Sequence, residues 1–421
     1  MRYASDLRTG RINPRKFEFG LSANVEALDL PTFVEKYLLS GVDLKSALAN
    51  LEPPFAQYGA LKKELARYMQ LAQQDDGKKL PYPRGILFSG TVYDGLPRLA
   101  NLLRLLGDLP DNVAIPEGPG RYEGALVEAV KQFQQRHGLR PDGYLNVATL
   151  DELNVPLSDR IQKIRLGMER LRWTHYDTTQ PGILVNLPGY RLYAHNAGAK
   201  LDFAMTVEVG DEYDHTPLLE AKIEYLVFRP YWDVPFDIQR DEVVPNIRDD
   251  PKYLADTHFE VITQDGKLVT DDKVSEPVLQ QIHSGKLRVR QKPGPDNSLG
   301  LVKFIFPNRY SVYLHDVPNW GYHFDSPDRA VSHGCVHLKE PAKLAAWALR
   351  DQPEWTPERI QQEMQGGQDN LRVNLSKPLT VHIVYMTAVV REDGKMYIFR
   401  DVYGYDAELQ DALAKGHLYL R

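Results

Sequence analysis

Apolar side chains recur at helical spacing through most of the first 173 residues. We predict residues 20–75 to be helical with a break at Pro53-Pro54, because residues three and four apart form one face of a helix. Residues 78–90 are rich in Pro and Gly, which predicts a boundary. Helical spacing returns over residues 96–154. One helix in this region carries an apolar face and ends at a glycine: Ala125, Leu126, Ala129, Val130, Phe133 and Gly138.

The spacing changes to that of strands after a further helix at residues 159–173. Apolar runs on both sides of Pro188-Gly189 predict a hairpin. The same signals predict strands at residues 203–209, 223–228, 301–306, 310–314 and 380–390, and helices at residues 341–350, 357–364 and 407–414. Residues 240–300 are polar and rich in Pro, and we interpret them as an insertion or lid with a little structure of its own.

Composition then limits the class of protein. Apolar residues make up 43% of the chain and charged residues 26%, which is typical of globular proteins. One cysteine in 421 residues excludes a disulfide framework and cysteine-rich zinc modules. No run approaches the roughly 20 apolar residues that cross a bilayer, so we expect no transmembrane segment. The net charge of −6, without a long basic run, argues against a nucleic-acid partner.

The single cysteine lies in the run Ser332-His333-Gly334-Cys335. A free thiol titrates near pH 8.5, so a nucleophilic cysteine needs an imidazole to take its proton. Four of the 12 histidines lie between His315 and His337. A strand that ends at His315 would hold this imidazole on a rigid sheet edge. Gly334 allows a tight backbone approach, which lets the amides of Gly334 and Cys335 face an oxyanion.

Two other interpretations of this thiol stay open. A buried, inert cysteine is the commoner fate of a cytosolic thiol. In an extended chain His333, Cys335 and His337 would face one side, and with His315 they could bind zinc. The zinc alternative gives no role to Gly334 or Ser332, and a closed shell would leave no reactive position.

One helical segment resembles the small three-helix peptidoglycan-binding domains. The resemblance covers about 60 residues and includes a helix, a Gly cap and an Asp-Gly turn in the expected order. It is carried by Ala129-Val130-Lys131-Gln132-Phe133-Gln134, His137-Gly138-Leu139, Asp142-Gly143, Thr149-Leu150 and Leu153-Asn154. A generic helical hairpin is the alternative.

A second resemblance involves the cysteine. The run Tyr313-Leu314-His315-Asp316, followed after 16 residues by Ser332-His333-Gly334-Cys335, resembles the signature of L,D-transpeptidases with a YkuD-type catalytic domain. The chain is similar to large Gram-negative members that have a peptidoglycan-binding domain, a scaffold segment and a capping insertion. Further matches are Thr216-Pro217, residues 230–235, Arg290-Gln291, Leu299-Gly300, residues 302–304 and Pro307-Asn308. His337 departs from the family, which usually has arginine at this place.

The resemblance implies a role for each of these residues. Cys335 would attack the diaminopimelate carbonyl of a tetrapeptide stem, and His315, oriented by a nearby carbonyl, would be its base. His333 and Gly334 would shape the oxyanion pocket together with Cys335, with His333 tuning a pre-charged thiolate that carbapenems acylate. The expected substrate-binding residues are Trp232, Tyr313, Ser332 and His337, although Trp232 could equally be ordinary core packing. No metal and no cofactor are expected.

The expected fold class is α+β and multidomain. We predict a helical scaffold segment at residues 1–90, a peptidoglycan-binding-like domain at 91–156 and a linker helix at 157–180. A mostly-β catalytic domain follows at 181–390, with a capping insertion at about 240–300. The C-terminal segment 391–421 is expected to pack on the scaffold.

The resemblance implies a peptidoglycan L,D-transpeptidase that forms 3→3 cross-links between a donor and an acceptor stem. We expect no nucleic-acid partner. Other cell-wall synthesis proteins are further expected partners. An L,D-carboxypeptidase, a hydrolase of peptidoglycan links, a non-catalytic peptidoglycan-binding scaffold and a zinc hydrolase are the alternatives. Peptidoglycan lies outside the inner membrane, so we expect a periplasmic protein. The first 20 residues lack the apolar run of a secretory signal, which we expect to have been removed.

Overall fold

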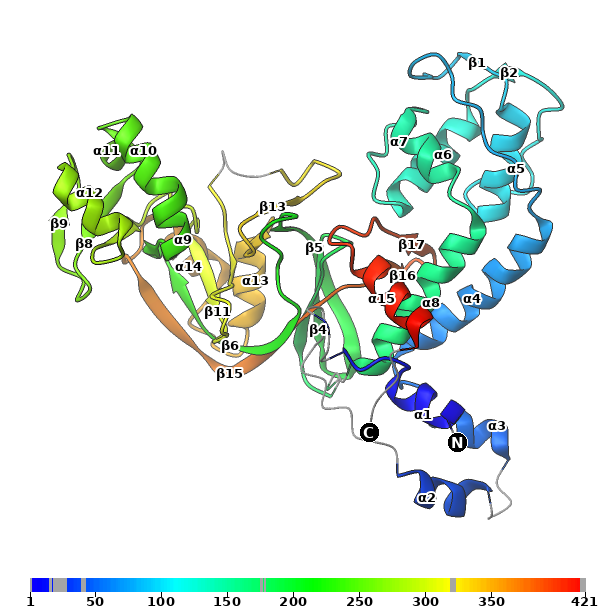
Figure 1. Ribbon diagram of the computed structural model, residues 1–421, viewed down its shortest axis with the longest axis horizontal. Coiled ribbons are helices and arrows are strands. Elements are labelled where there is room, and N and C mark those ends of the chain that lie inside the picture. Colours follow the sequence, from blue (N-terminus) through cyan, green and yellow to red (C-terminus); the bar gives the residue numbers. More distant parts are fainter. Residues whose placement is uncertain are drawn as a thin grey trace. The chain divides into compact units, whose positions relative to one another are not determined.

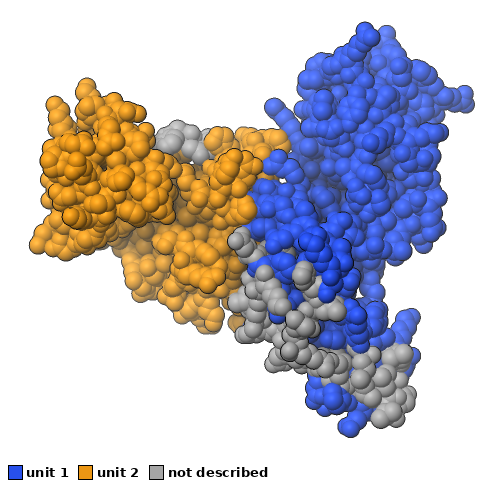
Figure 2. Space-filling view, viewed as in Figure 1, with its two compact units in different colours: residues 1–177, 186–189, 384–421 blue, residues 178–185, 190–383 orange. Residues whose placement is uncertain are grey.

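The computed structural model describes residues 2–14, 17, 29–38, 43–174, 177, 179–318 and 323–416. It divides into two compact units, coloured separately in Figure 2. Unit 1 contains residues 1–177, 186–189 and 384–421, and unit 2 contains residues 178–185 and 190–383. Helices dominate unit 1 and strands dominate unit 2, so the predicted α+β class is confirmed (Figure 1). None of the helices in these described ranges is long and apolar enough to span a membrane.

Two long helices organise unit 1. Helix α4 (Ala56–Gln74) begins just after the predicted break at Pro53-Pro54, and it packs against α8 (Leu157–Trp173). The hairpin of β16 (Ala388–Val390) and β17 (Met396–Ile398) contacts this pair, as does helix α15 (Tyr405–Lys415). Shorter helices precede α4: α1 (Arg2–Thr9), α2 (Leu30–Phe33), a π-helical turn (Val34–Leu38) and α3 (Leu44–Ala49). Residues 20–28 and 39–42 of the predicted helical region lie outside the described residues.

The small helical domain of unit 1 contains α5 (Leu96–Leu106), α6 (Ala125–Arg136), α7 (Val147–Leu153) and the short strands β1 (Val92–Tyr93) and β2 (Gly120–Arg121). The predicted end of α6 is confirmed, because Gly138 has a left-handed φ of +68°. Residues 78–90, predicted as a boundary, form part of this small domain. Leu80 donates its N–H to Asn154 (2.7 Å), and Leu87 pairs with Leu145, so the stretch is packed onto this domain.

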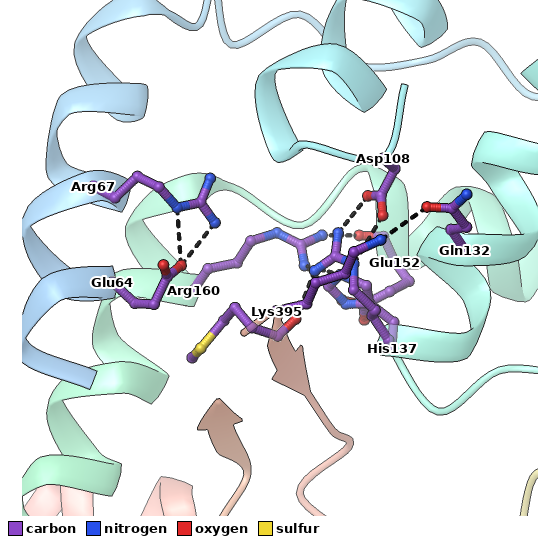
Figure 3. A network of polar contacts seen from close by, with 10 residues as sticks. Glu64, Arg67, Asp108, Gln132, His137, Glu152, Arg160 and Lys395 are labelled. Carbon is purple, nitrogen blue, oxygen red and sulfur yellow. Dashed lines mark hydrogen bonds and ion pairs between the residues drawn. The ribbon is translucent and has the colours of Figure 1, made fainter. Parts of the chain in front are cut away.

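A buried polar network connects α6 to the hairpin of the same unit (Figure 3). Arg136 donates to Asp108 (2.8 Å from Nε) and to the carbonyl of Met396 (2.6 Å), and both charged side chains are almost fully buried. Next to it, Glu152 lies 2.8 Å from His137 and 3.0 Å from Arg160. Burial lowers the pKa of His137 to about 3, so this ring is neutral at ordinary pH.

A nine-stranded sheet forms the body of unit 2, in the order β13-β5-β14-β12-β11-β6-β15-β3-β4. A further pairing of β4 with β5 closes the sheet on itself, which leaves few exposed edges. The strands are β3 (Gly182–Asn186), β4 (Arg191–Asn196), β5 (Lys200–Gly210), β6 (Leu219–Phe228), β11 (Val302–Ile305), β12 (Leu314–His315), β13 (Ala330–Ser332), β14 (Val336–Leu338) and β15 (Leu371–Val384). Helices α13 (Pro341–Ala348) and α14 (Pro357–Gly366) follow β14, as predicted.

Two strand predictions are wrong in extent. Residues 310–313 form a loop, because the side-chain amide of Asn308 donates to the carbonyls of Phe306 and Val312 (both 2.8 Å) and Ser311 has a left-handed φ of +56°. The predicted strand 380–390 is two strands, β15 and β16, which belong to different sheets. Unit 2 ends at residue 383.

The predicted insertion 240–300 contains more structure than its composition suggested. A four-stranded sheet runs in the order β7-β10-β8-β9, formed by β7 (Trp232–Asp233), β8 (Phe259–Ile262), β9 (Leu268–Thr270) and β10 (Arg288–Gln291). Helices α9 (Phe236–Ile238), α10 (Val244–Asp249), α11 (Tyr253–Asp256) and α12 (Glu276–His283) accompany it. Eleven buried residues form a core of its own, spread along 234–289, so apolar positions too scattered to show a period still assemble a folded cap.

Candidate functional site

The cysteine lies in the turn between two strands of the large sheet. Strand β13 ends at Ser332, and β14 begins at Val336. Gly334 has a φ of +96°, a conformation that L side chains rarely adopt. The hydroxyl of Ser332 donates to the carbonyl of Cys335 (2.6 Å), which closes the turn. The backbone therefore reverses at Gly334, and the extended alternation assumed for a zinc site is wrong here.

A second glycine allows the turn to sit against the end of β5. A Cβ built on Gly210 would lie 2.0 Å from the carbonyl of Asp214 and 3.0 Å from the Cα of Gly334. The N–H of Gly210 donates to the hydroxyl of Thr216 (2.8 Å), and the carboxylate of Asp211 accepts the N–H groups of the same turn. Two glycines thus bring two backbone turns into contact beside Cys335.

Strand pairing places His315 beside this turn. β12 runs parallel to β14, with His315 opposite His337, and the N–H of Val336 donates to the carbonyl of Tyr313 (3.0 Å). The imidazole of His315 is buried, and its Nδ1 donates to the carbonyl of Asp316 at 2.5 Å. This is a carbonyl contact of the kind that the family resemblance implied. Since Nδ1 holds the proton, Nε2 is the nitrogen left to act as a base.

The electrostatics of the pair differ from the expected pre-charged thiolate. Burial raises the pKa of Cys335 to about 11, although a backbone hydrogen bond from Tyr313 and the charge of Lys303 oppose this. Burial, together with the neighbouring His337 and Lys303, lowers the pKa of His315 well below its usual range. Burial therefore disfavours both the thiolate of Cys335 and the imidazolium of His315, which is opposite in direction to the expected pre-charged thiolate.

Lys303 acts electrostatically on both members of this pair. It lies opposite His315 in the pairing of β11 with β12. Its ammonium lies 5.7 Å from the ring centroid of Tyr313 and donates to the carbonyl of Tyr231 (3.3 Å). Burial lowers the pKa of Lys303, and that of Tyr313 is raised, mainly by burial.

Two predicted site residues contact the cap. The Nε2 of His333 lies 2.7 Å from a carboxylate oxygen of Glu242, and both side chains are about half exposed. Trp232 lies on β7 and packs against Phe259 of the cap core, with ring centroids 5.9 Å apart. The structure therefore places His333 against Glu242. It gives Trp232 a packing role in the cap, which was the alternative to substrate binding.

His337 is turned toward a buried carboxylate. Its Nδ1 lies 2.8 Å from Oε2 of Glu208, and its ring meets that of His315 edge-on at 4.8 Å. Within the described ranges, no group of three or more His, Cys, Asp or Glu side chains is arranged to hold a metal ion.

Comparison with protein families assigns this unit. Residues 180–363 match the model of the L,D-transpeptidase catalytic domain, known as YkuD. Residues 180–363 belong to this family. Two further models match unit 1: a "Scaffold domain" at residues 1–65 and a "Putative peptidoglycan binding domain" at residues 97–153. Both resemblances noted in the sequence are therefore confirmed at the level of the domain family.

Individual relatives of this L,D-transpeptidase domain are distant. A "Putative L,D-transpeptidase" of Haemophilus influenzae is 29% identical over 252 residues, which are 60% of this chain and 50% of that protein. The chain thus aligns with about half the length of this relative. Among solved structures, an L,D-transpeptidase from Stackebrandtia nassauensis is 16% identical (72% of this chain, 95% of that one) with a TM-score of 0.27. An L,D-transpeptidase in complex with imipenem is 12% identical (48% and 58%) with a TM-score of 0.23.

Three residues of the transpeptidase domain escaped the sequence reasoning: Glu208, Lys303 and Asp316. Lys303 and Asp316 lie within matched motifs but were given no role. Glu208 had a visible signal, because it is a carboxylate between Val207 and Val209 in an apolar strand, and such a residue needs a partner. Finding that partner required the register of β5 against β14.

Proposed function

We propose that the protein is a peptidoglycan L,D-transpeptidase that forms 3→3 cross-links through an acyl-enzyme on Cys335. The observation that carries the proposal is the placement of His315. Its Nδ1 is fixed on a backbone carbonyl, and it lies on the strand paired with the one that follows the cysteine turn. This placement supports the proposed roles of Cys335 as nucleophile, His315 as base and the carbonyl of Asp316 as the group that orients the base.

The proposed reaction has two halves. The thiol proton of Cys335 passes to Nε2 of His315 as sulfur attacks the diaminopimelate carbonyl of the donor stem. A carbon–sulfur bond forms, the carbon–nitrogen bond to the terminal D-alanine breaks, and the imidazolium returns its proton to the leaving amine. The side-chain amine of a second stem then attacks the thioester, forming an amide and restoring the thiol.

A neutral resting pair suits this sequence of steps. A thiol with a pKa of about 11 is a poor nucleophile until its proton moves, so reaction depends on a substrate positioned beside an available base. The backbone N–H groups of Gly334 and Cys335 are the proposed oxyanion donors, because the left-handed turn at Gly334 presents successive amides. Tyr313, half-buried beside the site, is a proposed groove residue.

The other parts of the chain have proposed roles in the same reaction. The peptidoglycan-binding domain would raise the local concentration of stems at the catalytic domain, as linked modules do. The folded cap, with its own core, would exclude water, which competes with the acceptor amine for the thioester. Because the proposed substrate lies outside the inner membrane, we propose a periplasmic location, where other cell-wall synthesis proteins act on the same polymer.

Intact-mass measurement with a carbapenem tests the nucleophile. We expect one covalent adduct per chain, lost in Cys335→Ala. The absence of an adduct on the native protein, or an adduct that persists in the Ala variant, would refute the assignment.

Incubation with purified tetrapeptide stems then tests the acceptor: a 3→3 dimer supports transpeptidation, and tripeptide with free D-alanine alone supports an L,D-carboxypeptidase. Activity that a chelator abolishes and zinc restores would support the metal alternative.

A further inference from the structure

Four titratable residues form one row across the large sheet. Lys303 on β11 lies opposite His315 on β12, His315 lies opposite His337 on β14, and His337 lies opposite Glu208 on β5. Directly opposed residues place their side chains on the same face of a sheet, with Cβ atoms about 5 Å apart. The proposed base thus lies between two groups that carry or can gain positive charge, and a carboxylate ends the row.

The carboxylate of Glu208 is held at both oxygens. It is fully buried, with Oε2 lying 2.8 Å from Nδ1 of His337 and Oε1 accepting the backbone N–H of His323. Burying a carboxylate is costly unless it is paired and hydrogen-bonded. The contacts of Glu208 fix the orientation of His337, whose ring in turn packs edge-on against His315 at 4.8 Å.

Proton transfer from Cys335 places a positive charge on His315, in the middle of this row. Lys303 and His337 both oppose that charge. The carboxyl of Asp316 is engaged by the N–H groups of Leu301 and Val317. The carboxylate of Glu208 contributes a negative charge beside His337. Without this charge the surroundings of His315 would be more positive, which would further oppose its protonation.

We propose that Glu208 is a positioning residue for the acylation step. Through His337 it fixes the ring beside the base, and its negative charge allows His315 to accept the thiol proton. Nothing in the motif around the cysteine requires this residue. The inference rests on the proposed roles of Cys335 and His315.

Glu208→Gln tests the charge while keeping the size of the side chain and an oxygen for the N–H of His323. The full-length protein is reacted with a carbapenem from pH 5 to 10, and the acylation rate is followed by intact mass. We expect a rate about tenfold lower at neutral pH, since each pKa unit lost by His315 makes its protonated form tenfold rarer. The acid limb of the pH profile should move to lower pH. Glu220→Gln, which alters a largely exposed carboxylate 3.8 Å from His382 in the same sheet, is the matched control and should match the native protein.

A second pair of variants separates charge from packing. In His337→Arg the side chain carries a permanent charge, which Glu208 can balance; in Glu208→Gln/His337→Arg it cannot. We expect the double variant to acylate at least about tenfold more slowly than His337→Arg. Equal rates in this pair, or a Glu208→Gln variant with the native rate and pH profile, would overturn the inference. The inference would also be overturned if the loss of acylation rate were fully explained by a smaller fraction of folded protein, as measured by thermal unfolding.

Alkylation of Cys335 by iodoacetamide provides a readout that does not need transpeptidase activity. If the native protein forms no carbapenem adduct, the proposed function fails, and the same variants are compared by their alkylation rates from pH 6 to 10. Slower alkylation in Glu208→Gln than in Glu220→Gln still supports the role of Glu208 in allowing His315 to take the thiol proton. Equal alkylation refutes it, and so does faster alkylation, which is the result expected if the lost negative charge acted directly on the thiolate.

Discussion

Removal of His315 gives the sharpest test of a neutral resting pair. With a pKa of about 11, the free thiol of Cys335 would be ionised in only about 3 chains per 10,000 at pH 7.5. The raised pKa disfavours the thiolate by roughly 3 kcal/mol, since each pKa unit is worth about 1.4 kcal/mol. In the proposed mechanism, direct transfer of the proton to His315 avoids waiting for this rare species.

In His315→Ala the reaction can proceed only after the thiol of Cys335 has ionised by itself. We expect its carbapenem acylation rate at pH 7.5 to fall by about 100-fold or more, the usual range for losing a general base. The rate should then rise about tenfold per pH unit up to pH 10, because the thiolate fraction does so below the thiol pKa. The native rate should change little between pH 7 and 9, since the pKa of its base lies below this range and that of the thiol above it.

Absorbance at 240 nm measures the thiolate directly, with Cys335→Ser as the blank. We expect no thiolate band in the native protein up to about pH 9. A native thiol that ionises with a midpoint below pH 8 would refute the neutral pair, and so would a His315→Ala variant whose acylation rate is independent of pH.

Three further predictions concern other parts of the molecule. Gly210→Ala should reduce carbapenem acylation about 100-fold, because its methyl group would lie 2.0 Å from a backbone carbonyl of the turn beside the nucleophile; Gly59→Ala, in open space, is the control. Lys303→Met should slow alkylation of Cys335 at pH 9 roughly several-fold, with recovery in Lys303→Arg, because the ammonium favours the thiolate. Asp108→Ala should destabilise unit 1 by about 3–5 kcal/mol in urea unfolding, because it leaves the guanidinium of Arg136 buried without its carboxylate, and an unchanged midpoint would contradict this.

The neutral pair also bears on the lone cysteine. A thiol that is ionised at rest reacts with oxidants and disulfides more readily than a protonated one. Cys335 is half-buried, and its pKa is raised, so it should resist such reactions until a substrate is bound. The same environment that makes the resting thiol a poor nucleophile would therefore protect it in an oxidising compartment.

Much of the local structure followed from the sequence alone. The helix that ends near Gly138 and the hairpin around Pro188-Gly189 were predicted from spacing and turn residues, and the structure has them. A strand does end at His315, but it contains only Leu314–His315, and it lies between β14 and β11 and not at the sheet edge that was expected. The loop at residues 310–313 was missed because its conformation depends on the amide of Asn308, a side-chain contact that no apolar period reveals. The cap was underestimated because its core residues are scattered among polar ones.

The candidate site, like the fold, was only partly predictable from the sequence. The sequence determined which groups could do the chemistry, because Cys335, His315 and Gly334 lie in a short motif whose residue types are distinctive. Only the tertiary structure decided their state. Burial set the direction of the pKa of the thiol and of the imidazole, and strand register placed Lys303 and Glu208 in the row that contains the base. Electrostatic energies depend on distance and on exclusion of water, and both arise only when strands far apart in the chain pair with one another.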